Sequence, residues 1–124
     1  MRLLLDSHIL IWWLAGDPRL GAARRDALET GDAETHVSAV SIWELALKRA
    51  AGKLDLGRLD LVALLKRYGL IELPLAARHA EAAVRLPPIH RDPVDRFLVA
   101  QALVEGLTLV SDDATIRRYR VSTL

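Results

Sequence analysis

Short, continuously apolar runs alternate along this chain with longer stretches of helical periodicity. The first run, Leu3-Leu4-Leu5, places no polar side chain on either side of the backbone, which is typical of a strand buried on both faces. Helical stretches separate the runs, and connections of that length join parallel strands. The pattern therefore predicts an α/β fold in which helices cover both faces of a small, mostly parallel sheet.

Glycine and proline mark where these elements end. We expect strands at 2–5, 35–39, 70–73 and 107–110, with an edge strand at 120–122. The expected helices are 7–15, 20–30, 41–51, 59–68, 76–85 and 93–105, followed by a helical turn at 113–117.

The 124 residues are enough for one hydrophobic core and too few for two, so residues 1–124 are expected to form a single domain. Seventeen Lys and Arg face sixteen Asp and Glu, and the net charge of +1 argues against nucleic-acid binding through bulk charge. A local basic patch remains compatible with that balance. The absence of cysteine excludes a disulfide scaffold, a thiolate nucleophile and a cysteine zinc site.

No targeting or membrane segment is expected near the start of the chain. The apolar run at 9–15 is far shorter than the roughly 20 residues that span a bilayer. Asp6 also interrupts the apolar stretch that a secretory signal requires. We therefore expect a soluble, cytoplasmic protein that does not contact a membrane.

Acidic residues gather where strands end and helices begin. Six of them either follow an expected strand or open an expected helix: Asp6, Glu44, Asp92, Asp95, Asp112 and Asp113. Binding sites of open parallel sheets form beyond the carboxyl ends of the strands. These side chains are therefore candidates for one shared crevice.

Each acid also has an ordinary explanation as a helix cap. The segment from Ser41 to Glu44 fits a capping box, and Asp92 followed by proline fits an N-cap. Asp6 and one of the pair Asp112 and Asp113 could cap in the same way. A non-catalytic α/β binding or signalling module whose acids are all caps is therefore the alternative reading.

Taken together, the acids exceed what capping requires, because two helix starts carry an extra carboxylate. Two unit charges about 4 Å apart repel by roughly 4 kcal/mol at an effective dielectric near 20, so a cluster needs a positive partner. Oxygen ligands select a hard cation such as Mg²⁺ or Mn²⁺. An ion held this way generates hydroxide and clamps a phosphate for a displacement reaction.

Four acidic motifs occur in order: Leu3-Leu4-Leu5-Asp6, Ser41-Ile42-Trp43-Glu44, Asp92-Pro93-Val94-Asp95-Arg96 and Leu109-Val110-Ser111-Asp112-Asp113. This series resembles a PIN domain, and most of all the VapC-type ribonuclease toxins of bacterial toxin–antitoxin pairs. The resemblance covers nearly the whole chain. It implies a three-layer α/β/α fold, an Mg²⁺-dependent endoribonuclease, a homodimer and an inhibitory antitoxin partner.

The resemblance implies that four acids are both catalytic and metal-binding: Asp6, Glu44, Asp95 and Asp113. Spacing from Ser111 favours Asp113 over its neighbour Asp112 as the fourth acid. Asp92 is an additional candidate that capping alone also explains. Val94 stands where the family often has Phe, and Ser111 stands where it often has Thr and keeps the hydroxyl.

Basic residues near these acids are expected to contact RNA phosphates, and the strongest candidates are Lys48, Arg91 and Arg96. Simple pairing with nearby acids is the alternative for each. The four histidines show no paired ligand spacing and are expected to be structural or solvated, although His90 lies near the proposed site.

A phosphoacceptor receiver domain has a similar length and sheet. It requires an acid pair after the first strand and a lysine after a late strand. Here the pair follows a late strand, and no lysine occurs after Lys66. The metal-dependent endoribonuclease and the inert module remain, and a melting temperature that does not respond to Mg²⁺ or Mn²⁺ would identify the inert module.

Overall fold

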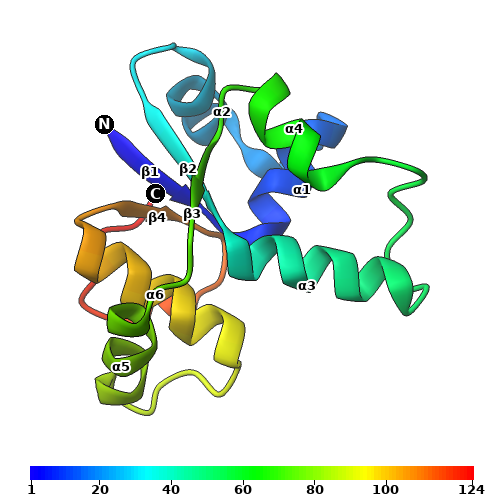
Figure 1. The fold of residues 1–124 in the computed structure, drawn as a ribbon. Helices are drawn as coiled ribbons and strands as arrows, with labels where there is room; N and C mark the ends of the chain where they lie inside the picture. The colour runs from blue at the N-terminus through cyan, green and yellow to red at the C-terminus, as the bar shows by residue number, and fades with distance from the viewer.

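The computed structural model describes all residues 1–124, which form a four-stranded sheet covered by six α-helices (Figure 1). The strand order is β3-β2-β1-β4, and every neighbouring pair is parallel. The strands are β1 (Arg2–Leu5), β2 (Glu34–Ser38), β3 (Ile71–Leu73) and β4 (Thr108–Val110). The predicted α/β class and parallel sheet are confirmed.

The helices are divided between the two faces of the sheet (Figure 1). They are α1 (Ser7–Ala15), α2 (Ala22–Glu29), α3 (Ala39–Ala50), α4 (Leu61–Arg67), α5 (Ala77–Arg85) and α6 (Pro93–Glu105). Helices α1, α2 and α4 cover one face, α6 covers the other with α5 packed on it, and α3 projects outward from the end of β2. None of them combines the length and the apolar character that crossing a membrane would need.

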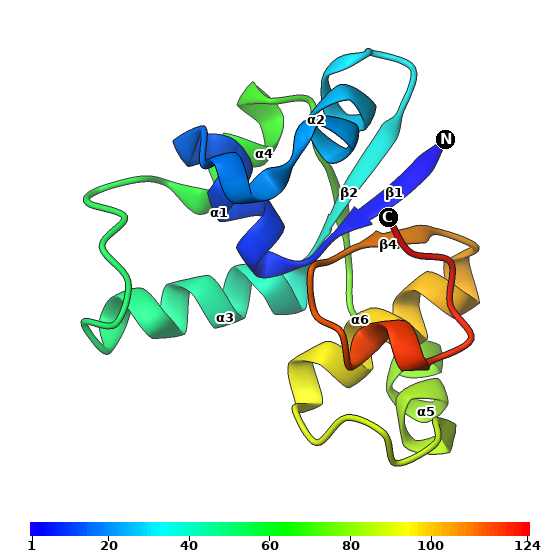
Figure 2. The same cartoon turned by 180° about the vertical axis from the view of Figure 1, so that it is seen from behind.

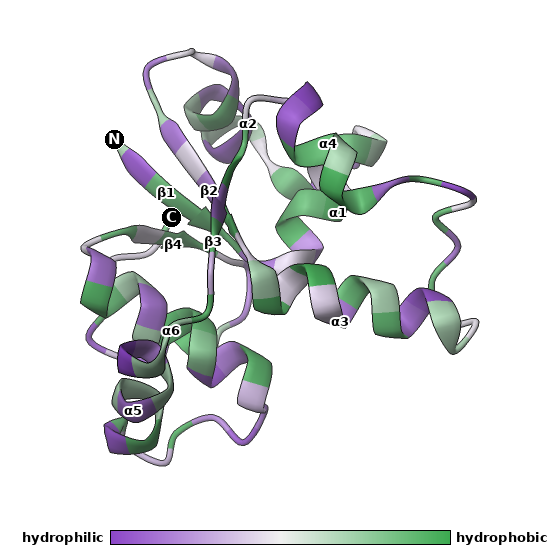
Figure 3. Cartoon of the chain, in the orientation of Figure 1, coloured by the Kyte–Doolittle hydropathy of each residue, from purple (hydrophilic) through white to green (hydrophobic).

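Strand β1 is buried on both faces, as its apolar run predicts. Leu3 and Leu5 pack with Ile9 of α1 on one face, whereas Leu4 packs with Leu98 of α6 on the other, and all are 0% exposed. This alternation follows from the period-2 geometry of a strand. Figure 3 shows the matching apolar colour along α1, which lies against this core.

Two expected elements differ from the structure. The helix expected at 20–30 is interrupted at Gly21, whose φ of 84° requires a residue without a Cβ, so a 3₁₀ turn (Pro18–Leu20) precedes α2. The edge strand expected at 120–122 is wrong. The C-terminal segment instead lies along β4 through a single parallel bridge between Leu109 and Thr123 (Figure 2).

The start of α3 also corrects the sequence analysis. The helix begins at Ala39, and its cap is Ser38, whose side-chain oxygen accepts a hydrogen bond from the Val40 amide at 3.1 Å. The predicted capping box from Ser41 to Glu44 is therefore wrong. Ser41 is buried with no partner for its hydroxyl, and Glu44 lies well inside the helix, where it caps nothing.

This cap yields a stability prediction. Ser38→Ala should lower the free energy of unfolding by about 1 kcal/mol, because the Val40 amide loses its acceptor. The matched control is Ser41→Ala, which removes an equally buried hydroxyl that has no partner and should cost little. Chemical denaturation of both variants measures the difference. Equal losses, or a larger loss for Ser41→Ala, would contradict the observed cap.

Candidate functional site

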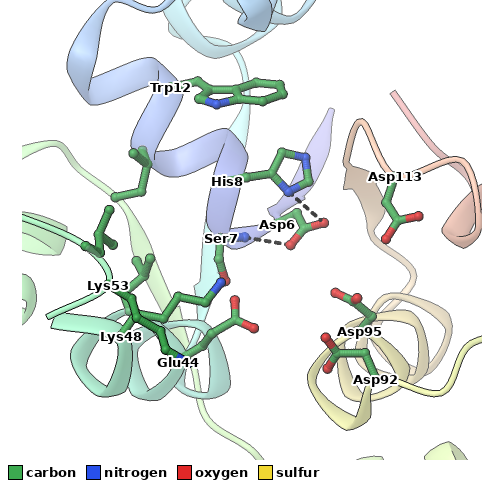
Figure 4. Close-up of a pocket in the computed structure, with 13 residues that line it drawn as sticks. Asp6, Ser7, His8, Trp12, Glu44, Lys48, Lys53, Asp92, Asp95 and Asp113 are labelled. Atoms are coloured by element: carbon green, nitrogen blue, oxygen red, sulfur yellow. Dashed lines mark hydrogen bonds and ion pairs between the residues drawn. The ribbon is translucent and has the colours of Figure 1, made fainter. Parts of the chain in front are cut away.

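A pocket of about 400 Å³ lies at the carboxyl edge of the sheet, between α1, α3, α6 and the segment after β4 (Figure 4). It contains five of the six acids expected to meet. Its charged and aromatic lining residues are Asp6, His8, Trp12, Glu44, Lys48, Lys53, Asp92, Asp95 and Asp113. Segments up to 107 residues apart thus contribute to one crevice.

Asp6 is held rigidly at the end of β1. Leu5 pairs in register with Val110, so the residues that follow these two strand ends are neighbours. The Ser111 hydroxyl donates to Asp6 Oδ2 at 2.7 Å, and the Ser7 amide donates to Asp6 Oδ1 at 2.7 Å. With both oxygens engaged and only 3% of the residue exposed, the carboxylate has a fixed orientation.

Ser111 connects the first acid to the last one. The Asp113 amide donates to Ser111 Oγ at 3.1 Å, while that hydroxyl donates to Asp6. Asp113 lines the pocket, whereas the carboxylate of Asp112 is exposed and pairs with Arg24 at 3.1 Å. The geometry thus agrees with Asp113 as the fourth acid and gives Asp112 a structural contact outside the pocket.

His90 lies between two of the acids. Its Nε2 is 2.9 Å from Asp95 Oδ2 and 3.0 Å from Asp113 Oδ2. In the neutral ring, the Asp92 amide donates to Nδ1 at 3.2 Å and leaves the hydrogen on Nε2. Burial disfavours the charged ring, but the hydrogen bond to Asp113 and the surrounding carboxylates outweigh it, so the pKa of His90 is raised.

The two acids beside His90 differ in their affinity for protons. Burial, followed by the negative charges of Asp6 and Asp92, raises the pKa of Asp95 from its ordinary 3.8 to about 7. Burial also acts on Asp113, but the hydrogen bonds from His90 and from the Thr115 amide hold its pKa below the usual range. The ionised form of Asp95 is therefore the one that a nearby positive charge would stabilise most.

Asp92 and Glu44 complete the acidic lining. Asp92 is the N-cap of α6, accepting from the Val94 amide at 2.9 Å, and it also lines the pocket. Capping therefore explains its presence without excluding a second role. Glu44 lies across the pocket on α3, half-buried, and its side chain makes no hydrogen bond or ion pair within the chain (Figure 4).

The residues fit a hard divalent cation. One ligand atom each from His90, Asp95 and Asp113 lies within 4.8 Å of the others. Asp6 projects toward the same space (Figure 4). Most donors are carboxylate oxygens, which suit Mg²⁺ and Mn²⁺, whereas imidazole suits softer ions. Such an ion would take over the charge balance that the His90 ring now supplies to Asp95 and Asp113.

The basic residues expected to contact RNA are divided between two surfaces. Lys48 lines the pocket, as does Lys53. Arg91 is exposed outside it, in a groove between α5 and α6. The guanidinium of Arg96 donates to the carbonyls of four residues, including Ala83 at 2.6 Å, so we assign it a structural role in place of the RNA contact expected from the sequence.

Sequence reasoning missed several residues of the pocket. His8 Nδ1 lies 3.4 Å from Asp6 Oδ2, and its Nε2 accepts from the Asp112 amide. Ser7 and Trp12 also line the pocket. All three lie on the first turns of α1, directly after the acid that ends β1. Their position in the sequence could have indicated this, because a helix that directly follows an acid at the end of a strand begins at the same edge of the sheet.

Comparison with known proteins places this geometry in a family. A model of the PIN domain matches residues 3–121. Ribonuclease VapC22 of Mycobacterium tuberculosis is 33% identical over 120 residues, which cover 94% of this chain and 91% of that protein.

Solved structures share the fold at low sequence identity. The crystal structure of VapBC2 from Rickettsia felis, bound to a DNA fragment from its promoter, has a chain that matches with a TM-score of 0.71 and 15% identity, covering 100% of this chain and 98% of that one. A toxin–antitoxin complex from Klebsiella pneumoniae matches with a TM-score of 0.69 and 16% identity over 98% of this chain and 95% of that one. The resemblance drawn from the acidic motifs is thus confirmed, and this chain belongs to the PIN-domain family.

Proposed function

We propose that this chain is a metal-dependent endoribonuclease of the VapC type, which hydrolyses RNA phosphodiester bonds with water as the nucleophile. The observation that carries the proposal is the meeting of Asp6, Glu44, Asp95 and Asp113 in one pocket. These acids come from four separate segments, and capping does not explain their convergence. The similarity to a protein named as a ribonuclease over 94% of the chain supports RNA as the substrate.

We propose Mg²⁺ as the resident ion, with Mn²⁺ able to use the same oxygen ligands. Asp6, Asp95 and Asp113 would hold it, directly or through water. When bound, a divalent ion supplies positive charge to a phosphate oxygen and activates water. Glu44 would hold a metal-bound water molecule or a second ion.

Different side chains of the pocket would orient the acids and the attacking water. The contacts from Ser7 and Ser111 keep Asp6 from turning away from the pocket. Glu44, free of intramolecular partners, is available to accept a hydrogen bond from the attacking water on the opposite wall. No residue in the pocket forms a Ser–His pair for covalent catalysis, which agrees with direct attack by water.

Two protein partners belong to the proposal: a cognate antitoxin that inhibits the enzyme and a second copy of the chain. The solved relatives include toxin–antitoxin complexes. Large apolar side chains are exposed on α3 and α5, where Trp43 is 58%, Leu47 52% and Val84 82% exposed. Surfaces of this kind mark protein interfaces. An active enzyme of this type, with RNA as its substrate, would work in the cytoplasm.

The first prediction tests the acids directly. Asp6→Asn keeps the shape of the side chain but removes one negative charge from a crowded site. RNA cleavage should be lost. The melting temperature should change little, because relief of the repulsion offsets the loss of one acceptor for the hydrogen bonds from Ser7 and Ser111. Asp112→Asn is the matched control, since that exposed carboxylate lies outside the pocket and should leave cleavage intact. Cleavage of a fluorescent RNA by Asp6→Asn at the wild-type rate in saturating Mg²⁺ would overturn the assignment.

A second prediction separates the two acids of α6. Asp92→Ala removes the cap and should lower the free energy of unfolding by about 1 kcal/mol while retaining most of the activity. Asp95→Asn should do the reverse, abolishing cleavage without loss of stability, because its charged form is disfavoured in the fold. Denaturation and cleavage assays on both variants decide the matter. Exchanged phenotypes would mean that the two roles are exchanged.

A third prediction concerns pH. Because the pKa of Asp95 rises from 3.8 to about 7 on folding, the native state binds more protons than the unfolded chain between these values. Without metal, stability contributed by this group is therefore present at low pH and is lost as pH rises toward 7. Mg²⁺ binds the ionised acids and should restore stability, more at pH 7.5 than at pH 5.

Melting curves at the two pH values, with Mg²⁺ and with a chelator, measure this linkage. A shift that is equal at both pH values would show that Asp95 is not part of the ion site. The absence of any shift would favour the non-catalytic module in which the acids serve only as caps.

A further inference from the structure

Two lysines without ion-pair partners, together with Glu44, form the wall of the pocket that faces Asp92, Asp95 and Asp113 (Figure 4). Asp92, Asp95 and Asp113 lie on the α6 side. Lys48 and Lys53 lie on the α3 side, and neither makes an ion pair with any carboxylate of the chain. Lysines that no carboxylate of the chain neutralises can bind an anionic ligand.

Ser7 contributes a second, independent feature to the same side. The residue is 4% exposed, and its hydroxyl has no hydrogen-bond partner. A buried hydroxyl without a partner is unfavourable, so its presence calls for a ligand that the chain itself does not supply. Ser7 lines the pocket, and Figure 4 shows its side chain directed away from the Asp6 carboxylate, toward the side where Lys48 lies.

The backbone around Ser7 adds partial positive charge. Ser7 is the first residue of the nine-residue helix α1, and the amides of a first helical turn have no carbonyl partner within the helix. One of them, the Ser7 amide, is taken by Asp6. Helix N-termini of this kind favour phosphate groups.

We propose that Ser7 donates its hydroxyl hydrogen to a non-bridging oxygen of an RNA phosphate, in a subsite completed by Lys48 and the first turn of α1. The inference rests on the proposed ribonuclease function and adds a substrate contact to it. The acids and their ion then act on one side of the phosphate, while this subsite holds the strand from the other side. Ser7 is in this account a residue that binds substrate and does not bind the metal.

Ser41 provides a matched control for Ser7. Its hydroxyl is likewise buried and without a partner, but it does not line the pocket. If an orphaned hydroxyl merely reflects packing, removing either one should have the same effect. If Ser7 serves the substrate, only Ser7→Ala should change RNA binding.

The experiment compares Ser7→Ala with Ser41→Ala in the full chain. Cleavage of a short fluorescent RNA at saturating Mg²⁺ gives KM and kcat, titration with Mn²⁺ gives the metal Kd, and melting curves report folding. For Ser7→Ala we expect KM to rise about tenfold, as for a lost hydrogen bond to a charged group, with kcat within about twofold. The Mn²⁺ Kd and melting temperature should match wild type, and Ser41→Ala should match wild type throughout.

An unchanged KM for Ser7→Ala, or a weakened affinity for Mn²⁺, would overturn the subsite, the second by assigning the hydroxyl to the metal. Cleavage by the wild-type protein would still stand in either case, so the proposed function would survive. Failure of the wild-type protein to cleave any RNA would instead refute the proposed function.

A second variant tests the same subsite through salt. Lys48→Gln should weaken RNA binding and reduce the slope of log(kcat/KM) against log salt by about one, as expected for one lost phosphate contact. An unchanged slope would remove Lys48 from the subsite.

Discussion

Strand β1 lies between β2 and β4 and runs parallel to both, and this position determines where the acids of the site meet. Leu5 pairs with Val37 on one side and with Val110 on the other, so β1 and β4 end at the same level and β2 ends one residue later. The next residues along β1 and β4, Asp6 and Ser111, are therefore neighbours and can share a hydrogen bond of 2.7 Å. The flanking charges fix this register, because a slip by one residue would draw Arg2 or Asp6 into a buried position inside the strand.

The acids that this arrangement collects repel one another, and the chain offsets the repulsion only in part. Asp6 receives two hydrogen bonds, and Asp113 receives one from His90. Asp95 is left with burial and neighbouring charge that raise its pKa to about 7. The remaining need for positive charge is the physical reason to place a divalent ion there. The lysines on the α3 side form no ion pair with these acids and remain free to hold an anionic substrate.

The sequence predicts the strands and the convergence of the acids at one sheet edge because both depend on local patterns. Burial on two faces makes the strand at 2–5 continuously apolar, and the sheet edge follows from where it ends. The sequence does not predict which of two similar residues caps a helix. Ser38 and Ser41 are both serines and equally suitable as N-caps, and the structure shows that Ser38 caps α3. Likewise, His90 enters the site because the loop before α6 places it between two acids, and no spacing along the chain indicates this.

A crystal structure of the chain with Mn²⁺, in which anomalous scattering locates the ion, tests directly whether the acids form a metal site. We expect a peak in the pocket, coordinated by Asp6, Asp95 and Asp113, with the His90 ring displaced from between the latter two acids. A pocket without a peak at saturating Mn²⁺, with His90 still 2.9 Å from Asp95, would contradict it. In that event the acids would be structural, and the chemistry proposed for the pocket would have no basis.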